Sequence, residues 1–141
     1  MIPTAVIDAS ATLAWLFDES EEAARFEERL GSATFSAPWL WRIEVVNAVL
    51  VKERRGLISQ AQSARLFRSL DALDIEIALE PMDRPLERLA SVARPHQLTA
   101  YDAVYLELAM TLSIPLYTLD KNLQQAALRS GVNLFGFHSG D

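Results

Sequence analysis

The chain has 141 residues, half of them hydrophobic, which is enough for one domain with a substantial core and too few for two domains of ordinary size. Its 13 basic and 19 acidic residues give a net charge of −6, which argues against a protein that coats nucleic acid through bulk positive charge. It has no cysteine and only two histidines, His96 and His138, which excludes disulfides, thiolate metal sites, cysteine nucleophiles and histidine-rich metal centres. We expect a single domain over residues 1–141.

Neither a membrane span nor a secretory signal is evident in the sequence. The apolar run at 45–51 is interrupted by Asn47 and ends at Lys52, well short of the roughly 20 residues that cross a bilayer. The first residues carry no basic region ahead of their apolar side chains. We therefore expect no membrane association and a cytoplasmic location.

Blocks of apolar residues in the first half of the chain predict strands that alternate with helices. The first run is short and β-branched, which is typical of a strand buried on both faces. The elements expected here are a strand at 4–7, a helix from about Ser10, a helix at 20–30 ending at Gly31, a strand at 34–37, a helix from Pro38 to Arg55 closed by Gly56, and a helix from Ser59 to about Leu73.

The second half continues the same alternation. The elements expected here are a strand at 75–79, a helix at 84–94 before Pro95, a helix from Thr99 to Leu112, a strand at 115–119, a helix at 121–130 capped by Gly131, and a short last strand at 132–135. Strands separated by helices imply a parallel sheet that is covered on both faces. The fold class that the sequence predicts is therefore α/β.

Two acidic residues, Asp8 and Asp120, directly follow predicted strands. Open parallel sheets bind ligands beyond the carboxyl ends of their strands, so both positions suit a functional site. Each residue also suits the N-terminus of the helix that follows it, through capping and the helix dipole. Position alone leaves both interpretations open.

Glu44 lies in a predicted helix that is apolar nearly all round beyond its first turn, so we expect its side chain to be buried on most sides. An unpaired buried carboxylate costs several kcal/mol, on the order of the penalty for desolvating an ion. Glu44 therefore needs a partner, either an arginine in a structural ion pair or a ligand.

Asp102 has a simpler explanation, because the segment from Thr99 to Asp102 has the form of a helix-capping box. The helix that follows is nevertheless apolar at 103–110 except for Glu107, which lies about 140° away around the helix axis. Asp102 is thus a second carboxylate on a helix that is expected to be buried.

A divalent cation would explain the four acidic residues together, because its charge relieves the repulsion between them. Oxygen ligands without histidine or cysteine favour Mg²⁺ or Mn²⁺, and sites of this kind leave positions open for water and substrate phosphate. The chemistry that this predicts is attack of an activated water on a phosphate. Ser10, Thr118 and Asn122 lie near these acids in the sequence and either orient water or phosphate or cap helices.

The combination of these motifs resembles the PIN domain family, and within it the VapC-type toxins of toxin–antitoxin pairs. The resemblance covers essentially the whole chain in order, spacing and length. It rests on the segments Val6-Ile7-Asp8-Ala9-Ser10, Arg42-Ile43-Glu44-Val45-Val46-Asn47-Ala48-Val49, Thr99-Ala100-Tyr101-Asp102-Ala103-Val104-Tyr105-Leu106-Glu107-Leu108-Ala109 and Thr118-Leu119-Asp120-Lys121-Asn122-Leu123.

The resemblance implies a three-layer α/β/α sandwich with a small, mainly parallel sheet. It also implies a metal-dependent ribonuclease that uses Mg²⁺ or Mn²⁺, forms a homodimer and is neutralised by a cognate VapB-like antitoxin. The acidic cluster of such an enzyme, catalytic and metal-binding, maps without substitution onto Asp8, Glu44, Asp102 and Asp120.

Basic residues concentrate in one segment despite the acidic balance of the chain. Five of the thirteen fall within seventeen positions, namely Lys52, Arg54, Arg55, Arg65 and Arg68. We interpret Lys52, Arg54 and Arg55 as a candidate contact for RNA or for the antitoxin. The alternative is that they form the solvated tip of a helical hairpin.

Two further interpretations remain open. A catalytically silent binding module would keep the acidic residues for structure alone. A phosphoacceptor signalling domain has a similar length and a magnesium-binding acidic pocket, but it would carry an acidic pair after the first strand, where Asp8 stands alone.

Overall fold

The protein is described by a computed structural model, which covers residues 2–17, 20–79 and 84–136. Four parallel strands form one sheet in the order β3-β2-β1-β4. Their bounds are Ala5–Ile7 (β1), Phe35–Pro38 (β2), Ile75–Ala78 (β3) and Leu116–Tyr117 (β4). The parallel sheet that the alternating pattern predicted is confirmed.

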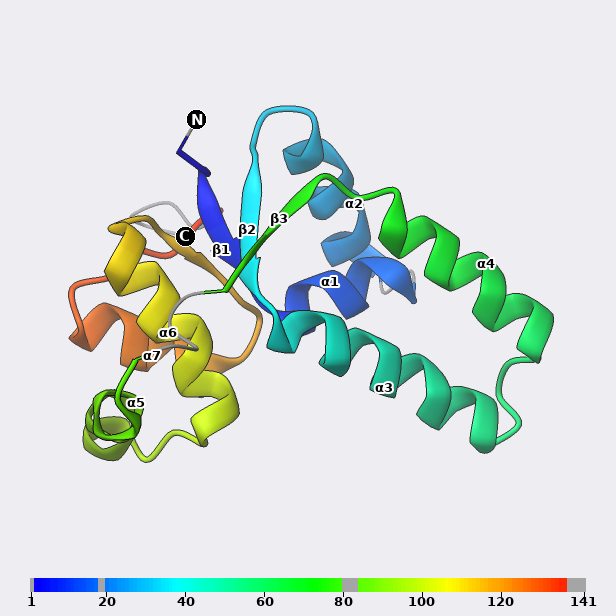
Figure 1. Ribbon diagram of the computed structural model, residues 1–141. Coiled ribbons are helices and arrows are strands. Elements are labelled where there is room, and N and C mark those ends of the chain that lie inside the picture. Colours follow the sequence, from blue (N-terminus) through cyan, green and yellow to red (C-terminus); the bar gives the residue numbers. More distant parts are fainter. Residues whose placement is uncertain (1, 18–19, 80–83, 137–141) are drawn as a thin grey trace.

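Helices cover both faces of this sheet. Their bounds are Ala9–Leu16 (α1), Ser20–Leu30 (α2), Leu40–Arg54 (α3), Gln60–Asp71 (α4), Leu86–Ala93 (α5), Ala100–Leu112 (α6) and Lys121–Arg129 (α7), with a short 3-10 helix at Arg94–His96. Figure 1 shows α1 to α4 on one side of the strands and α5 to α7 on the other. The three-layer α/β/α sandwich is thereby confirmed.

The core lies where α2 and α6 meet the central strands. β1 is fully buried along its length, as expected for a parallel strand covered on both faces. The rings of Phe26, Phe35 and Tyr117 pack against one another with centroids 5.9 to 6.2 Å apart. This cluster fixes α2 to β2 and β4, the two strands that flank β1.

The helices α3 and α4 form an arm that extends away from the sheet (Figure 1). Its turn contains Gly56 in the left-handed region, with φ of 73°, which the missing side chain of glycine tolerates. Ser59 then caps α4 with a full capping box, accepting from the Gln62 amide while the Gln62 side chain accepts from the Ser59 amide. Both predicted boundaries are confirmed.

Three predicted boundaries are wrong. Pro38 was expected in the first turn of a helix, but it is the last residue of β2, in register with Ala78. β4 is only two residues long, so Asp120 lies beyond its end. The expected strand at 132–135 is a single bridge between Leu116 and Leu134, because so short a β4 offers no ladder to extend.

Within the described ranges, no helix combines the length and the apolar character that crossing a membrane requires.

Candidate active site

Asp8 follows β1 and is only 4% exposed. Its carboxylate caps α1 by accepting from the Ala11 amide at 3.1 Å, so the capping role that the sequence suggested is real. It also accepts hydrogen bonds from the hydroxyls of Ser10, at 2.7 Å, and Thr118. The carboxylate is thus held by neutral donors from two segments more than 100 residues apart.

Ser10 and Thr118 tie the end of β1 to the segment after β4. The Ser10 hydroxyl lies 3.3 Å from that of Thr118 and accepts from the Leu119 amide at 2.9 Å. Thr118 in turn accepts from the Asp120 amide at 3.1 Å. Two of the three residues predicted to orient water or phosphate therefore lie beside Asp8, whereas Asn122 is exposed in the first turn of α7.

Glu44 lies on α3 and is less buried than predicted. The helix buries Trp41, Val45 and Val49, while Ile43 and Val46 are 47% and 40% exposed. The helix therefore has two apolar faces, one packed against the core and one exposed to solvent. Glu44 is half-buried and lies between them.

Among the residues that the structure describes, Glu44 takes part in no structural ion pair of the kind that was considered for it. Its Oε1 accepts from the Tyr105 hydroxyl on α6 at 2.5 Å. The Tyr105 ring is buried, which raises the pKa of its hydroxyl and keeps it protonated as a donor. No pattern in the sequence had singled out Tyr105 as a site residue. Its position three residues after Asp102, on the same side of the helix, was the available signal.

Asp102 lies on α6 and Asp120 at the start of α7. Thr99 caps α6 by accepting from the Asp102 amide at 3.1 Å, and Asp120 caps α7 by accepting from the Leu123 amide at 2.9 Å. Asp102 is half-buried and Asp120 is exposed. The capping explanation therefore holds for both helices, and a hydrogen bond with the Thr99 side chain lowers the pKa of Asp102 against the effect of its burial.

The four carboxylates act on one another, with Asp102 as their common neighbour. Burial raises the pKa of Asp8 from 3.8 to about 6 against the lowering effect of its hydrogen bonds, and repulsion by Asp102 adds to the rise. Burial and then Asp102 raise the pKa of Glu44, and burial and then Asp120 raise the pKa of Asp102. The structure thus brings together all four acidic residues that the sequence singled out.

The oxygen-only donor set fits a hard divalent cation. No recorded ion pair among the described residues involves any of the four carboxylates. Across the same residues, no three acidic or imidazole side chains are already arranged as metal ligands. Protein hydrogen bonds engage one or both oxygens of Asp8, Glu44 and Asp120 instead. The repulsion that remains is what a cation would relieve.

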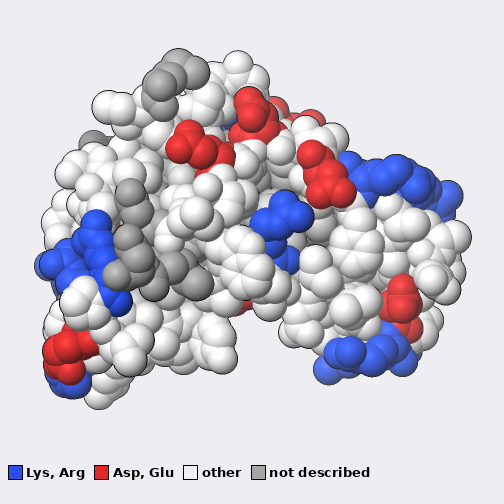
Figure 2. Space-filling model, viewed as in Figure 1, with Lys and Arg blue, Asp and Glu red and all other residues white. Residues whose placement is uncertain are grey.

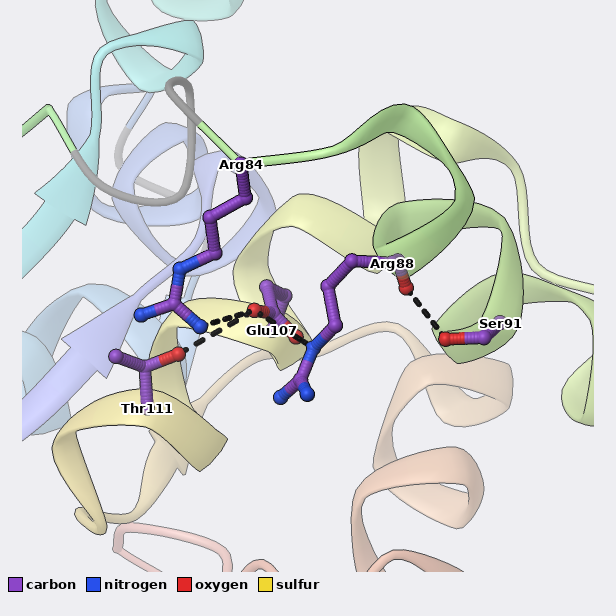
Figure 3. Close-up of polar contacts among 5 residues, drawn as sticks. All are labelled: Arg84, Arg88, Ser91, Glu107 and Thr111. Carbon is purple, nitrogen blue, oxygen red and sulfur yellow. Dashed lines mark hydrogen bonds and ion pairs between the residues drawn. The ribbon is translucent and has the colours of Figure 1, made fainter.

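Glu107, one and a half turns after Asp102 on α6, shows the opposite arrangement. It is fully buried, and Figure 3 shows the guanidinium groups of Arg84 and Arg88 both reaching it. Arg84 Nη1 lies 3.1 Å from Oε1 and Arg88 Nε 3.0 Å from Oε2, while Thr111 donates to Oε1 at 3.4 Å. This ion pair fixes α5 to α6, and no local sequence pattern had indicated it.

The basic residues of the arm lie apart from the acidic cluster. Figure 2 shows basic side chains at the outer end of α3 and along α4. Arg54, Arg55, Arg65 and Arg68 are exposed, whereas Lys52 is half-buried with its ammonium group 4.4 Å from the centre of the Phe17 ring. Lys52 thus has a structural contact in addition to the role predicted for it.

Because the pKa of Asp8 is raised in the folded protein, the free energy of unfolding should depend on pH. The folded protein binds this proton more tightly than the unfolded chain, so between about pH 4 and 6 the free energy of unfolding falls as pH rises. The loss from Asp8 alone is on the order of 3 kcal/mol and is complete above pH 6. Glu44 and Asp102 shift in the same direction.

Asp8→Asn should flatten this dependence, because asparagine still caps α1 but carries no charge. We expect the variant to be the more stable protein at pH 7.5 in EDTA, measured by urea unfolding. Asp74→Asn, which changes an exposed residue outside the cluster, serves as the control. Parallel curves for wild type and Asp8→Asn from pH 4.5 to 7.5 would contradict the prediction.

Comparisons with known proteins show similarity in sequence and in fold. Ribonuclease VapC3 of Pyrobaculum aerophilum is 28% identical over 121 residues, which cover 85% of this chain and 92% of that protein. The structure of PAE2754 from Pyrobaculum aerophilum has a TM-score of 0.68 at 23% identity, covering 89% of this chain and 86% of that one. FitAcB from Neisseria gonorrhoeae has a TM-score of 0.63 at 17% identity, covering 93% and 96%. The two structures share the fold.

The sequence also matches the PIN domain family over residues 5–128. The matched region runs from β1 into α7 and contains all four acidic residues. The chain belongs to the PIN domain family.

Proposed function

We propose that the protein is a metal-dependent endoribonuclease whose site is formed by Asp8, Glu44, Asp102 and Asp120. The observation that carries this proposal is the convergence of the Asp8, Glu44 and Asp120 carboxylates on Asp102 at the carboxyl end of the sheet. No basic side chain is a partner of any of the four in the described residues. The similarity to Ribonuclease VapC3 and the membership of the PIN family support RNA as the substrate.

The residues divide the work between holding a cation and orienting its surroundings. The four carboxylates would hold Mg²⁺ or Mn²⁺, which when bound activates water and stabilises charge on a phosphate. Ser10 and Thr118 fix the Asp8 carboxylate through their hydroxyls. Asp102 lies at the centre of the cluster, because each of the other three carboxylates interacts electrostatically with it.

The alternatives make different predictions. The family match favours a nuclease over a phosphoacceptor signalling domain. A catalytically silent module of the same family would keep the fold and the acidic residues without cutting RNA, so only an activity measurement separates it from the enzyme.

The test is cleavage of a mixed cellular RNA pool by the purified protein with Mn²⁺ or with EDTA. We expect cuts that need the cation and leave 5′-phosphates, and a loss of about 100-fold or more in Asp102→Asn, since outer-shell partners alone change activity 10–100-fold. Asp74→Asn should cut like wild type. Cation binding without any cutting would favour the silent module, and cutting in EDTA would contradict a metal-dependent site.

The exposed arginines at the tip of the arm are the proposed contact for RNA phosphates. Each phosphate contact releases counterions, so Arg54→Glu with Arg55→Glu should weaken RNA binding and flatten its salt dependence. Binding is measured by fluorescence anisotropy in EDTA, where the RNA stays intact. Arg94→Glu with Arg129→Glu, at two exposed positions outside the arm, makes the same change in net charge and serves as the control. A salt slope equal to that of wild type would contradict the RNA contact.

A cognate VapB-like antitoxin is the second partner that we propose, on the strength of the resemblance to VapC-type toxins and the similarity to Ribonuclease VapC3. Co-expression with the product of an adjacent short gene should give a stable complex. If Arg54→Glu with Arg55→Glu keeps its RNA binding but does not form this complex, these two arginines contact the antitoxin and not the RNA.

We also propose that the protein is a homodimer. Trp39, Ile43 and Val46 are 44%, 47% and 40% exposed, and their spacing places them on one face at the start of α3. A contiguous apolar stripe of this kind is more typical of a buried contact than of free surface. Light scattering should give the mass of two chains, and Val46→Glu should reduce it to one; a monomeric wild type would contradict the dimer.

A further inference from the structure

We propose that Tyr105 is a positioning residue for the cation site, which it serves by holding the Glu44 carboxylate in place from the neighbouring helix. This inference rests on the proposed function and concerns how the site is preorganised. Nothing in the sequence marked Tyr105 as more than a core residue of α6.

The geometry is that of a buried neutral donor facing a carboxylate. Tyr105 is 1% exposed, and its hydroxyl donates to Glu44 Oε1 at 2.5 Å. The bond joins α6, which carries Asp102 three residues earlier, to α3. It therefore sets the separation of two helices that each contribute a carboxylate to the site.

The Tyr105 hydroxyl also lies within the field of the cluster. It interacts electrostatically with Glu44, Asp8 and Asp102. A lysine or arginine at this place would neutralise the carboxylates and compete with a cation, whereas a phenol donates a hydrogen bond and leaves the negative charge intact. Tyrosine thus orders a ligand without reducing the attraction of the site for Mn²⁺ or Mg²⁺.

The hydrogen bond occupies one oxygen of Glu44. No other donor to this carboxylate is recorded in the described residues, so Oε2 is left for the site. Because Glu44 is only half-buried, its side chain would turn among several rotamers without Tyr105. Outer-shell partners of this type typically change metal affinity 10–100-fold when they are removed.

A purely structural role makes a different prediction. If the bond only satisfies a buried hydroxyl, its loss changes stability and leaves cation affinity alone. If Tyr105 acts through Glu44, its loss lowers cation affinity, and it does so only while Glu44 is present. A double-mutant cycle separates the two cases.

The experiment measures Mn²⁺ affinity by isothermal titration for wild type, Tyr105→Phe, Glu44→Gln and the double variant. Tyr105→Phe keeps the ring in the core, and unfolding in EDTA checks that it folds. The matched control is Tyr101→Phe, the same change on the same helix at a side chain that is 63% exposed.

We expect the Kd for Mn²⁺ to rise about tenfold in Tyr105→Phe, to stay unchanged in Tyr101→Phe, and to be no higher in the double variant than in Glu44→Gln. At saturating Mn²⁺, the KM for RNA should equal that of wild type. A Kd for Tyr105→Phe within twofold of wild type, or an additive effect in the double variant, would overturn the inference.

Asp102→Asn in the same titration distinguishes this failure from failure of the proposed function. If Asp102→Asn loses Mn²⁺ binding while the Kd of Tyr105→Phe stays within twofold of wild type, the shared cation site stands and the positioning role falls. If Asp102→Asn binds Mn²⁺ as wild type does, the shared site falls and the positioning role falls with it.

Discussion

Four carboxylates lie near one edge of a small parallel sheet, and their mutual repulsion is the constraint that the surrounding side chains must accommodate. Asp102 and Glu107 lie on the same helix, and the protein treats them differently. Glu107 is fully buried and meets two arginines within 3.1 Å. Asp102 is half-buried and meets three other carboxylates. The fold can therefore neutralise a buried acid where structure alone requires it, and the contrast supports the proposal that the Asp102 cluster binds an external cation.

Neutral donors make this crowding tolerable in the folded chain. Hydroxyls of Ser10, Thr118 and Tyr105 and the Ala11 amide point at the carboxylates and oppose the rise in their pKa. The donors come from three separate segments. Together with their acceptors Asp8 and Glu44, the same bonds join the ends of β1 and β4 and link α3 to α6. The same hydrogen bonds therefore contribute both to the stability of the fold and to the preorganisation of the site.

The sequence singled out the four acidic residues because each one interrupts an apolar run or follows a predicted strand. It predicted the fold for the same reason, since a buried parallel strand and a capped helix are local patterns. The partners were beyond its reach. Tyr105 meets Glu44 across 61 positions, and Arg84 meets Glu107 across 23, and no local pattern encodes those contacts. The exposed face of α3 was also missed, because apolar spacing does not say whether an apolar face meets the core or another surface.

The length of α3 keeps the carboxylate cluster near its start apart from the arginines at its end. Glu44 and Arg54 lie ten residues apart, which is about 15 Å along the helix axis. That distance exceeds the Debye length of about 8 Å at physiological ionic strength. The arginines at the tip therefore do not relieve the carboxylates at the base, and the carboxylates do not weaken the attraction of the tip for an anionic partner. A chain with a net charge of −6 can in this way present a basic surface and an acidic site on one helix.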